Sequence, residues 1–195
     1  MLVRMVVAEL LTSVIQPDIG IRLQQIKNPQ FLKSFVEDNK NNCVLGSTNK
    51  RITNILNIGK SPNTEKGEEF KTFVKSEVNP IIEQYRLDFG LEPLAQETSW
   101  LLLKYDKGHF FNSHIDDGFG FTRTVSVVIF ANDNYVGGEL VFDRLDVTIR
   151  PVFGEILIFP SSYPFAHSVK PILDGIKYSL VNWYTFSGES HGTLC

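Results

Sequence analysis

The sequence predicts an α+β protein that is mainly β, in which a helical first part supports a β-sheet domain. Two observations carry this prediction. Up to residue 97, apolar residues recur at helical spacing on either side of a polar segment. Beyond Pro93 the chain changes to short β-prone runs separated by turn residues, which is typical of a sandwich or barrel and not of βαβ units. The predicted strands are 98–106, 122–131, 138–142, 146–150, 155–159, 165–170 and 177–186.

The first helix is predicted directly after Asn28. This residue can cap a helix, Pro29 suits the first helical position, and the apolar residues within 31–36 share one face. Residues 41–67 are rich in Asn, Ser, Thr, Gly and Lys, with only short apolar interruptions. We expect a long mobile loop there, placed like a loop that covers a substrate.

A second helix is predicted from Glu68 onward, where apolar residues again follow helical spacing. Pro80 forces a kink, or a restart with Asn79 as the cap. Gly90 is expected to close the helix. The tail from Ser187 to the last residue is rich in Gly and Ser and is expected to fray.

Length and composition indicate one domain with a substantial core. The chain has 195 residues, of which 43% are hydrophobic and 21% charged. We divide it into a helical support region and mobile loop (1–97), a β core (98–186) and a tail (187–195). The formal net charge of −3 and the pI of about 5.8 argue against nucleic acid as a partner, because no global positive field would attract a phosphate backbone.

Two further features bear on location. The apolar stretch 1–15 carries Arg4 and Glu9 and is shorter than the roughly 20 residues of a bilayer span. It also lacks a small-residue cleavage pattern, so we expect a first strand or helix of the domain and no membrane partner.

Cys43 and Cys195 are the only cysteines. We therefore expect no disulfide framework, a reducing compartment and a cytoplasmic location.

One segment places a histidine and a carboxylate two residues apart in an extended context. Side chains at i and i+2 of a strand leave the same face, so His114 and Asp116 can reach one point while Ile115 points away. His167 lies in a later β-prone run. Each feature alone also fits a solvated strand end or a core imidazole. Together, two histidines and a carboxylate form the facial triad typical of non-haem iron(II), although zinc accepts the same ligands.

Lys177 adds an independent observation. Along the last predicted strand, Lys177, Ser179, Val181 and Trp183 share one face. If Trp183 is buried, the lysine points inward too, and a buried ammonium without a partner is costly. An anionic ligand, such as the distal carboxylate of a dicarboxylic acid, would satisfy it. The alternative is that the lysine extends to solvent.

The spacing of these four residues resembles that of the prolyl 4-hydroxylase family of 2-oxoglutarate dioxygenases. His167 follows Asp116 by 51 positions and Lys177 follows His167 by 10. The resemblance covers roughly residues 98–186, and residues 1–97 show only a general similarity to the family's helical support region. Further matching features are Tyr105, Arg123-Thr124, Gly137-Gly138-Glu139-Leu140 and Trp183.

The resemblance implies a double-stranded β-helix, a cupin-like jelly roll whose sheets enclose the metal. It implies that His114, Asp116 and His167 are the catalytic iron(II) ligands and that 2-oxoglutarate chelates the metal while its far carboxylate meets Lys177. Dioxygen is then the second co-substrate and ascorbate the reductant. The reaction couples decarboxylation to succinate and carbon dioxide with hydroxylation of an unactivated C–H bond.

The resemblance also suggests roles for two further residues. Tyr105 resembles a family tyrosine that binds near the co-substrate, but a phenol on a half-buried strand can equally be structural. Arg123 is a candidate substrate contact, with a surface salt bridge as the alternative. Asp116 favours hydroxylation over halogenation, because related halogenases leave the carboxylate position open for chloride.

The preferred hypothesis is an enzyme that hydroxylates a prolyl residue of a peptide or protein. A second hypothesis keeps the chemistry and changes the substrate to a free amino acid, another side chain or an alkylated nucleobase. The acidic pI and a lysine where nucleic-acid demethylases usually carry arginine count against the nucleobase. A third hypothesis is a jelly-roll module that binds a metal, such as zinc, without oxygen chemistry.

Overall fold

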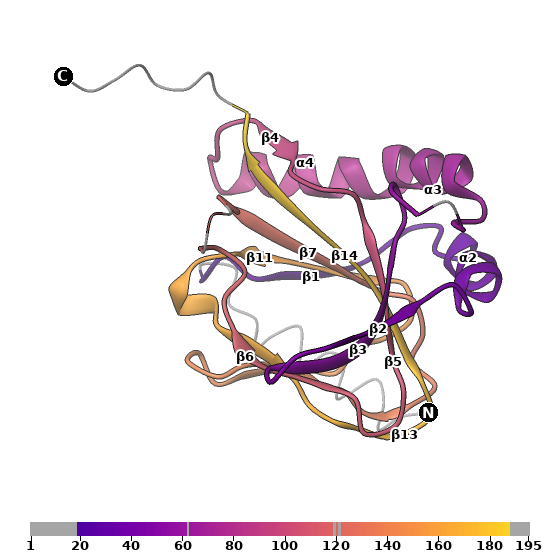
Figure 1. Cartoon of the computed structure of the whole chain (residues 1–195). Helices are drawn as coiled ribbons and strands as arrows, with labels where there is room; N and C mark the ends of the chain where they lie inside the picture. The colour runs from indigo at the N-terminus through magenta and orange to yellow at the C-terminus, as the bar shows by residue number, and fades with distance from the viewer. Residues whose placement is uncertain (1–18, 62, 119, 121, 188–195) are drawn as a thin grey trace, which may run out of the picture.

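The computed structural model describes residues 19–61, 63–118, 120 and 122–187. Over these residues the strands form a 12-stranded sheet and a separate two-stranded sheet (Figure 1). The strands are β1 (Arg22–Gln25), β2 (Val44–Ser47), β3 (Arg51–Asn57), β4 (Leu94–Gln96), β5 (Leu101–Tyr105), β6 (Phe110–His114), β7 (Val125–Phe130), β8 (Val136–Gly137), β9 (Leu140–Phe142), β10 (Val147–Ile149), β11 (Glu155–Pro160), β12 (His167–Val169), β13 (Ile172–Asp174) and β14 (Lys177–Phe186).

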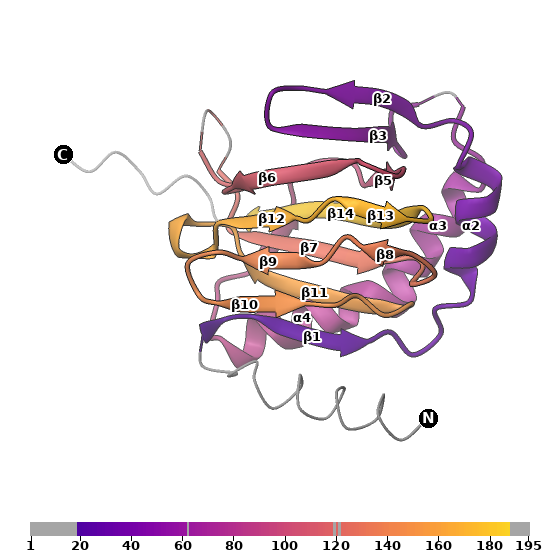
Figure 2. The ribbon, with the colours of Figure 1, turned by 90° about the horizontal axis from the view of Figure 1, so that it is seen from below.

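The large sheet curls back on itself. Its order is β1-β11-β7-β14-β5-β3-β6-β12-β9-β10, with β2 added beside β3 and β4 beside β14, and β8 and β13 pair separately. The turning point is β3, which pairs with β5 over its second half and with β6 through Arg51 and Ile52. Seen from below, β6, β12, β9 and β10 lie in front of β14, β7 and β11 (Figure 2). The predicted double-stranded β-helix is therefore confirmed.

Alternation along the strands separates two hydrophobic cores. In β11, Ile156 and Ile158 pack toward the helices, whereas Leu157 and Phe159 point into the curl of the sheet. This is the period of two expected for a strand that is covered on both faces. All six residues of β7 are buried for the same reason. The inner core leaves space for a site, and the outer core attaches the helices.

Within the described residues, three α-helices cover the outer face of the sheet (Figure 1). They are α2 (Phe31–Asn39), α3 (Gly67–Phe73) and α4 (Asn79–Asp88). A short π-helix, Val74–Val78, connects α3 to α4 directly before Pro80. The two predicted helices are thus present. Gly90 has a φ of 60°, which closes α4 as expected.

The predicted cap of α2 is wrong. The helix begins after Gln30, with no side-chain cap bond. Asn28 instead donates its side-chain amide to Glu77 at 2.9 Å and accepts no bond from its own helix. A hydrogen bond to a charged carboxylate is stronger than one between neutral groups. Asn28 therefore connects the segment before α2 to the π-helix that contains Glu77.

The prediction of a loop over 41–67 is wrong for residues 44–57, which form the β2–β3 hairpin. The strand β3 is central to the sheet, with Thr53 and Leu56 buried. Its partner β2 lies at an edge, where Val44 is 72% and Leu45 59% exposed. The polar residues that suggested a loop therefore flank and join two paired strands.

The seven predicted strands are all present, although most are shorter than expected. The run 165–170 begins late, at His167, because Tyr163–Phe165 form a 3-10 turn. The element predicted within 1–15 and residues 188–195 of the predicted tail lie outside the described residues. No helix found in the described ranges is long and apolar enough to cross a membrane.

Candidate metal centre and its cavity

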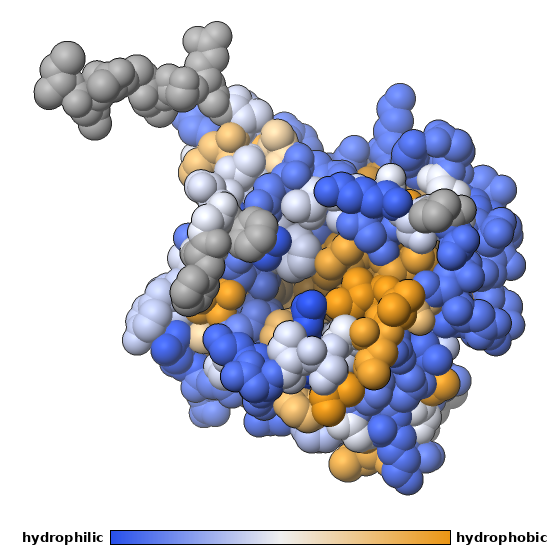
Figure 3. Space-filling model, viewed as in Figure 1, coloured by the Kyte–Doolittle hydropathy of each residue, from blue (hydrophilic) through white to orange (hydrophobic). Residues whose placement is uncertain are grey.

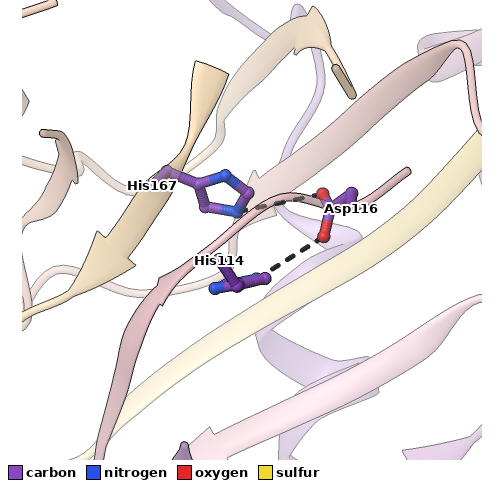
Figure 4. A group of neighbouring side chains, drawn as sticks. All are labelled: His114, Asp116 and His167. Carbon is purple, nitrogen blue, oxygen red and sulfur yellow. Dashed lines mark ion pairs between the residues drawn. The ribbon is translucent and has the colours of Figure 1, made fainter. Parts of the chain in front are cut away.

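Three side chains converge inside the curl of the sheet. His114 ends β6, Asp116 follows two residues later, and His167 begins β12. The pairing of β6 with β12 sets His114 opposite His167. Nε2 of His114 lies 3.5 Å from one carboxylate oxygen of Asp116, and Nε2 of His167 lies 3.8 Å from the other (Figure 4). Because one potential ligand atom from each residue lies within 4.8 Å of the others, the three can bind one metal ion.

The backbone fixes the tautomer of each imidazole. Nδ1 of His114 lies 2.9 Å from the carbonyl oxygen of Asn112, and Nδ1 of His167 lies 3.1 Å from that of Phe165. A carbonyl can only accept, so both Nδ1 atoms carry hydrogen and both Nε2 lone pairs face Asp116. Burial also lowers the pKa of His167. Neutral imidazoles with oriented Nε2 atoms are the form that binds a divalent ion.

Hydroxyl groups orient the carboxylate. Ser126 on β7 donates to Oδ2 of Asp116 at 2.6 Å, and the hydroxyls of Ser126 and Ser161 lie 2.8 Å apart. Burial raises the pKa of Asp116. In the metal-free site, His114 and His167 lower it by a larger amount when their rings are protonated, and the hydrogen bond from Ser126 lowers it as well. The pKa of this carboxyl is therefore well below its usual range. The third ligand is an ionised carboxylate with a fixed orientation.

Aromatic rings hold the two imidazoles in place. Phe111 stacks on His114 with ring centroids 3.6 Å apart and 12° between the planes. Phe159 meets His167 edge-on at 4.8 Å and 74°. Both contacts restrict ring rotation about the metal position.

A cavity extends from the triad to Lys177, the first residue of β14. Lys177 is 1% exposed and donates to the carbonyl oxygen of Gly138 at 2.7 Å. Burial lowers its pKa to about 7, and Glu139 opposes this in part. Within the described ranges no carboxylate forms a salt bridge with Lys177. The aliphatic residues that line the cavity are Leu101, Leu103, Val127, Val128, Leu140, Val169 and Val181.

Gly138 makes this lysine contact possible. Its φ is +67°, and a Cβ there would lie 2.6 Å from Ile172 and 3.3 Å from the Lys177 side chain. A residue with a side chain would be strained at this φ and would push against Ile172 and Lys177. The surface of the molecule is hollowed near the centre of the view in Figure 3, where apolar side chains gather and hydrophilic ones surround them.

Comparison with known proteins identifies the β core. Residues 100–185 match the family model of the 2OG-Fe(II) oxygenase superfamily. Over these residues the chain is similar to a 2OG-Fe(II) oxygenase domain. The match spans β5 to β14 and so includes the triad and Lys177. The name of the superfamily specifies iron(II) and 2-oxoglutarate.

Two curated relatives are PKHD-type hydroxylases. A PKHD-type hydroxylase of Rippkaea orientalis is 34% identical over 94 residues, which is 44% of this chain and 41% of the relative. One of Synechococcus sp. is 34% identical over 125 residues, which is 60% of this chain and 53% of the relative. The chain therefore spans about half the length of the curated relatives it matches.

A solved structure shows the same fold. The prolyl hydroxylase of Trichoplax adhaerens, in complex with a peptide of a hypoxia inducible factor, superposes with a TM-score of 0.70. It is 24% identical, and the match covers 85% of this chain and 83% of that one. The chain is thus prolyl 4-hydroxylase-like in sequence pattern and in architecture, as its motif spacing predicted.

The structure places Tyr105 inside the oxygenase domain beside Lys177. The two residues pair across β5 and β14, and Tyr105 is 2% exposed. Burial raises the pKa of Tyr105, so its phenol stays protonated. Its proximity to Lys177 suits a co-substrate contact, and that role stays a prediction.

Arg123 has several contacts within the chain. Its Nε donates to Glu97 at 2.8 Å and one terminal nitrogen lies 3.3 Å from the backbone oxygen of Asp116. The guanidinium also lies over the ring of Trp183 at 3.8 Å. These contacts anchor the segment that carries Asp116. A direct substrate contact by Arg123 stays a prediction.

Sequence reasoning missed three residues of the site: Ser126, Ser161 and Arg51. A signal existed for Ser126, because a hydroxyl within the apolar run 125–130 needs a buried partner. Ser161 follows β11 without such a pattern. Arg51 lines the cavity, but it lies in a polar segment where alternation gives no inward direction.

Proposed function

We propose that this chain is an Fe(II)- and 2-oxoglutarate-dependent dioxygenase that hydroxylates a prolyl residue of a peptide or protein. The coupled reaction converts 2-oxoglutarate to succinate and carbon dioxide, with dioxygen as co-substrate and ascorbate as reductant. One observation carries the proposal: a single cavity joins a His-Asp-His triad to a buried lysine that no described carboxylate neutralises.

The donor set fits iron(II). Two neutral imidazoles and one carboxylate on one side of an ion leave its other positions open, and this is the ligand set of non-haem iron oxygenases. Bound iron, with dioxygen and the keto acid, supplies the oxidising power that an unactivated C–H bond requires. Zinc would accept the same triad, but a plain zinc site gives no reason for an inward lysine.

The side chains of the cavity position and enclose the reactants. Lys177 holds the distal carboxylate of the co-substrate, and this anion offsets the cost of the buried ammonium. Ser126 fixes the orientation of Asp116 and so keeps both imidazoles and the carboxylate directed at one point. The apolar walls between the two ends exclude water, which strengthens the charge interactions inside.

The prolyl substrate is supported by the names of similar proteins and by the fold. The neighbour from Trichoplax adhaerens binds a peptide as a prolyl hydroxylase. In the present chain the β2–β3 hairpin brings Arg51 to the cavity, and we propose that this hairpin covers the substrate.

A cytoplasmic location is also part of the proposal. It is supported by the low cysteine content of two residues, which is typical of proteins in a reducing compartment.

Turnover with a peptide library tests the proposal. Purified protein with Fe(II), ascorbate and 2-oxoglutarate should form succinate, and mass spectrometry should find one added oxygen on proline. His167→Ala, in the same assay, controls for iron chemistry free in solution. Oxygen added to a free amino acid or another side chain would replace the prolyl assignment. Metal binding without succinate under every condition would instead indicate a metal-binding module.

A further inference from the structure

Arg51 brings a second cation into the cavity of the oxygenase domain. It is the first residue of β3, directly after the hairpin turn, and it is partly buried. Its guanidinium lies over the ring of Phe111 at 5.3 Å, and that ring stacks on the ligand His114. Pairing of Arg51 with Phe111 across β3 and β6 fixes this placement. The sheet itself therefore holds the guanidinium one aromatic ring away from the metal position.

The charge of Arg51 is not neutralised by the described part of the chain. No carboxylate in the described residues forms a salt bridge with it, and Asp116 is already engaged by two imidazoles and Ser126. The charge reaches into the cavity: burial raises the pKa of Tyr105, and Arg51 lowers it in part. An unpaired guanidinium in a partly desolvated cavity is suited to binding an anion.

We propose that Arg51 binds a carboxylate of the primary substrate, so that the enzyme selects targets with an acidic group close to the hydroxylated residue. This inference rests on the proposed function. Guanidinium presents two parallel N–H donors that match a carboxylate, and stacking on Phe111 limits their orientations. Both carboxylates of 2-oxoglutarate already have places in the proposed function, one at the metal and one at Lys177. The anion that remains for Arg51 comes from the substrate.

A matched pair of variants on the same hairpin tests this assignment. Arg51→Gln removes the cavity charge, and Lys50→Gln removes the adjacent charge, which is exposed to solvent. Both are assayed with proline-centred peptides that carry Asp or Glu, or their amides, within three positions on either side. A second set compares a free C-terminal carboxylate with a C-terminal amide. Thermal melting of both variants checks that each is folded.

We expect the wild type and Lys50→Gln to process the acidic peptides with a kcat/KM on the order of tenfold above that of the amide peptides. In Arg51→Gln this ratio should approach one. Arg51→Glu should reverse the preference toward peptides with Lys in place of Asp. The position of the preferred acid, or the C-terminal set, identifies the source of the carboxylate.

Several results would overturn the assignment. Equal kcat/KM for acidic and amide peptides in the wild type would do so, as would a library from which no peptide is processed. A higher KM for 2-oxoglutarate in Arg51→Gln, with the acid preference intact, would assign Arg51 to the co-substrate instead. Anaerobic binding of 2-oxoglutarate to the Fe(II)-loaded wild type reports separately on the proposed function. If that binding occurs and the acid preference does not, the Arg51 assignment alone fails.

Discussion

The two ends of the cavity differ in how their polar groups are satisfied. At the metal end, each imidazole donates to a backbone carbonyl and the carboxylate accepts from Ser126. At the other end, buried Lys177 donates to one carbonyl oxygen, and no group in the described part of the chain forms a hydrogen bond with the hydroxyl of Ser179. The polar groups of the metal end thus have hydrogen-bond partners within the protein. The lysine end holds a charge at a cost that an anion would offset.

The largest effect is expected from breaking the metal end. His167→Ala should lower affinity for a divalent ion by more than about 100-fold, because loss of an oriented ligand costs more than loss of its hydrogen-bond partner. Titration with Mn(II), followed by electron paramagnetic resonance, measures this. His109→Ala, at a histidine outside the triad, is the control. Equal affinity in the two variants would show that the ion binds elsewhere.

Removing the charge of Lys177 should weaken 2-oxoglutarate binding and at the same time stabilise the ligand-free protein. Lys177→Met should weaken 2-oxoglutarate binding by on the order of 100-fold, because the distal carboxylate loses a buried cation. The same change should raise the melting temperature of the ligand-free protein, because an apolar chain replaces an unpaired ammonium. Calorimetry of both properties, with exposed Lys170→Met as control, checks this. Co-substrate affinity at the wild-type level would remove Lys177 from its role.

The lysine end should also respond to pH. Burial lowers the pKa of Lys177 to about 7 from 10.5, so above pH 7 the charged fraction falls about tenfold per unit. The dissociation constant for 2-oxoglutarate should be about tenfold higher at pH 8 than its plateau below pH 6. In the unfolded chain the lysine keeps its proton up to 10.5, so the ligand-free protein should gain stability from this group between pH 7 and 10.5. Both trends should vanish in Lys177→Met, and their persistence would locate the titration elsewhere.

A smaller effect is expected from the hydroxyls behind the carboxylate. Ser126→Ala should lower metal affinity by about tenfold, because Asp116 loses its only described hydroxyl donor. Ser161→Ala should have a weaker effect, since this hydroxyl reaches the carboxylate through Ser126. Ser126→Thr keeps the donor and serves as the control. The same Mn(II) titration applies, and no difference between the Ala and Thr variants would assign the serine to packing alone.

Local sequence patterns were sufficient to predict most strands of the β core and the candidate site residues on them. Alternation put Lys177 on the face of Trp183 and predicted an inward lysine if that ring is buried; the structure shows Trp183 partly buried and Lys177 1% exposed. The i and i+2 spacing brought His114 and Asp116 to one side of a strand. The turn residues between short apolar runs separated the strands β5, β7, β9 to β12 and β14, whereas β6, β8 and β13 were not among the predicted strands.

What the sequence did not reveal depends on contacts between distant segments. The β2–β3 hairpin owes its central place to pairing with β5 and β6, and its Asn- and Lys-rich composition gave no sign of this. Arg51 enters the cavity through the same pairing. The Ser126–Ser161 contact joins residues on different segments and depends on the β7–β11 register. Asn28 likewise bonds to Glu77, 49 residues away, and does not cap the adjacent helix.

The central claim is that one cavity binds the metal and the keto acid together, with the triad at one end and Lys177 at the other. A crystal structure of the protein prepared anaerobically with Fe(II) and 2-oxoglutarate tests it most directly. We expect iron bound by both Nε2 atoms and by Asp116, and the distal carboxylate within hydrogen-bonding distance of Nζ of Lys177. A keto acid directed away from Lys177, or iron bound without one of the three ligands, would contradict the account.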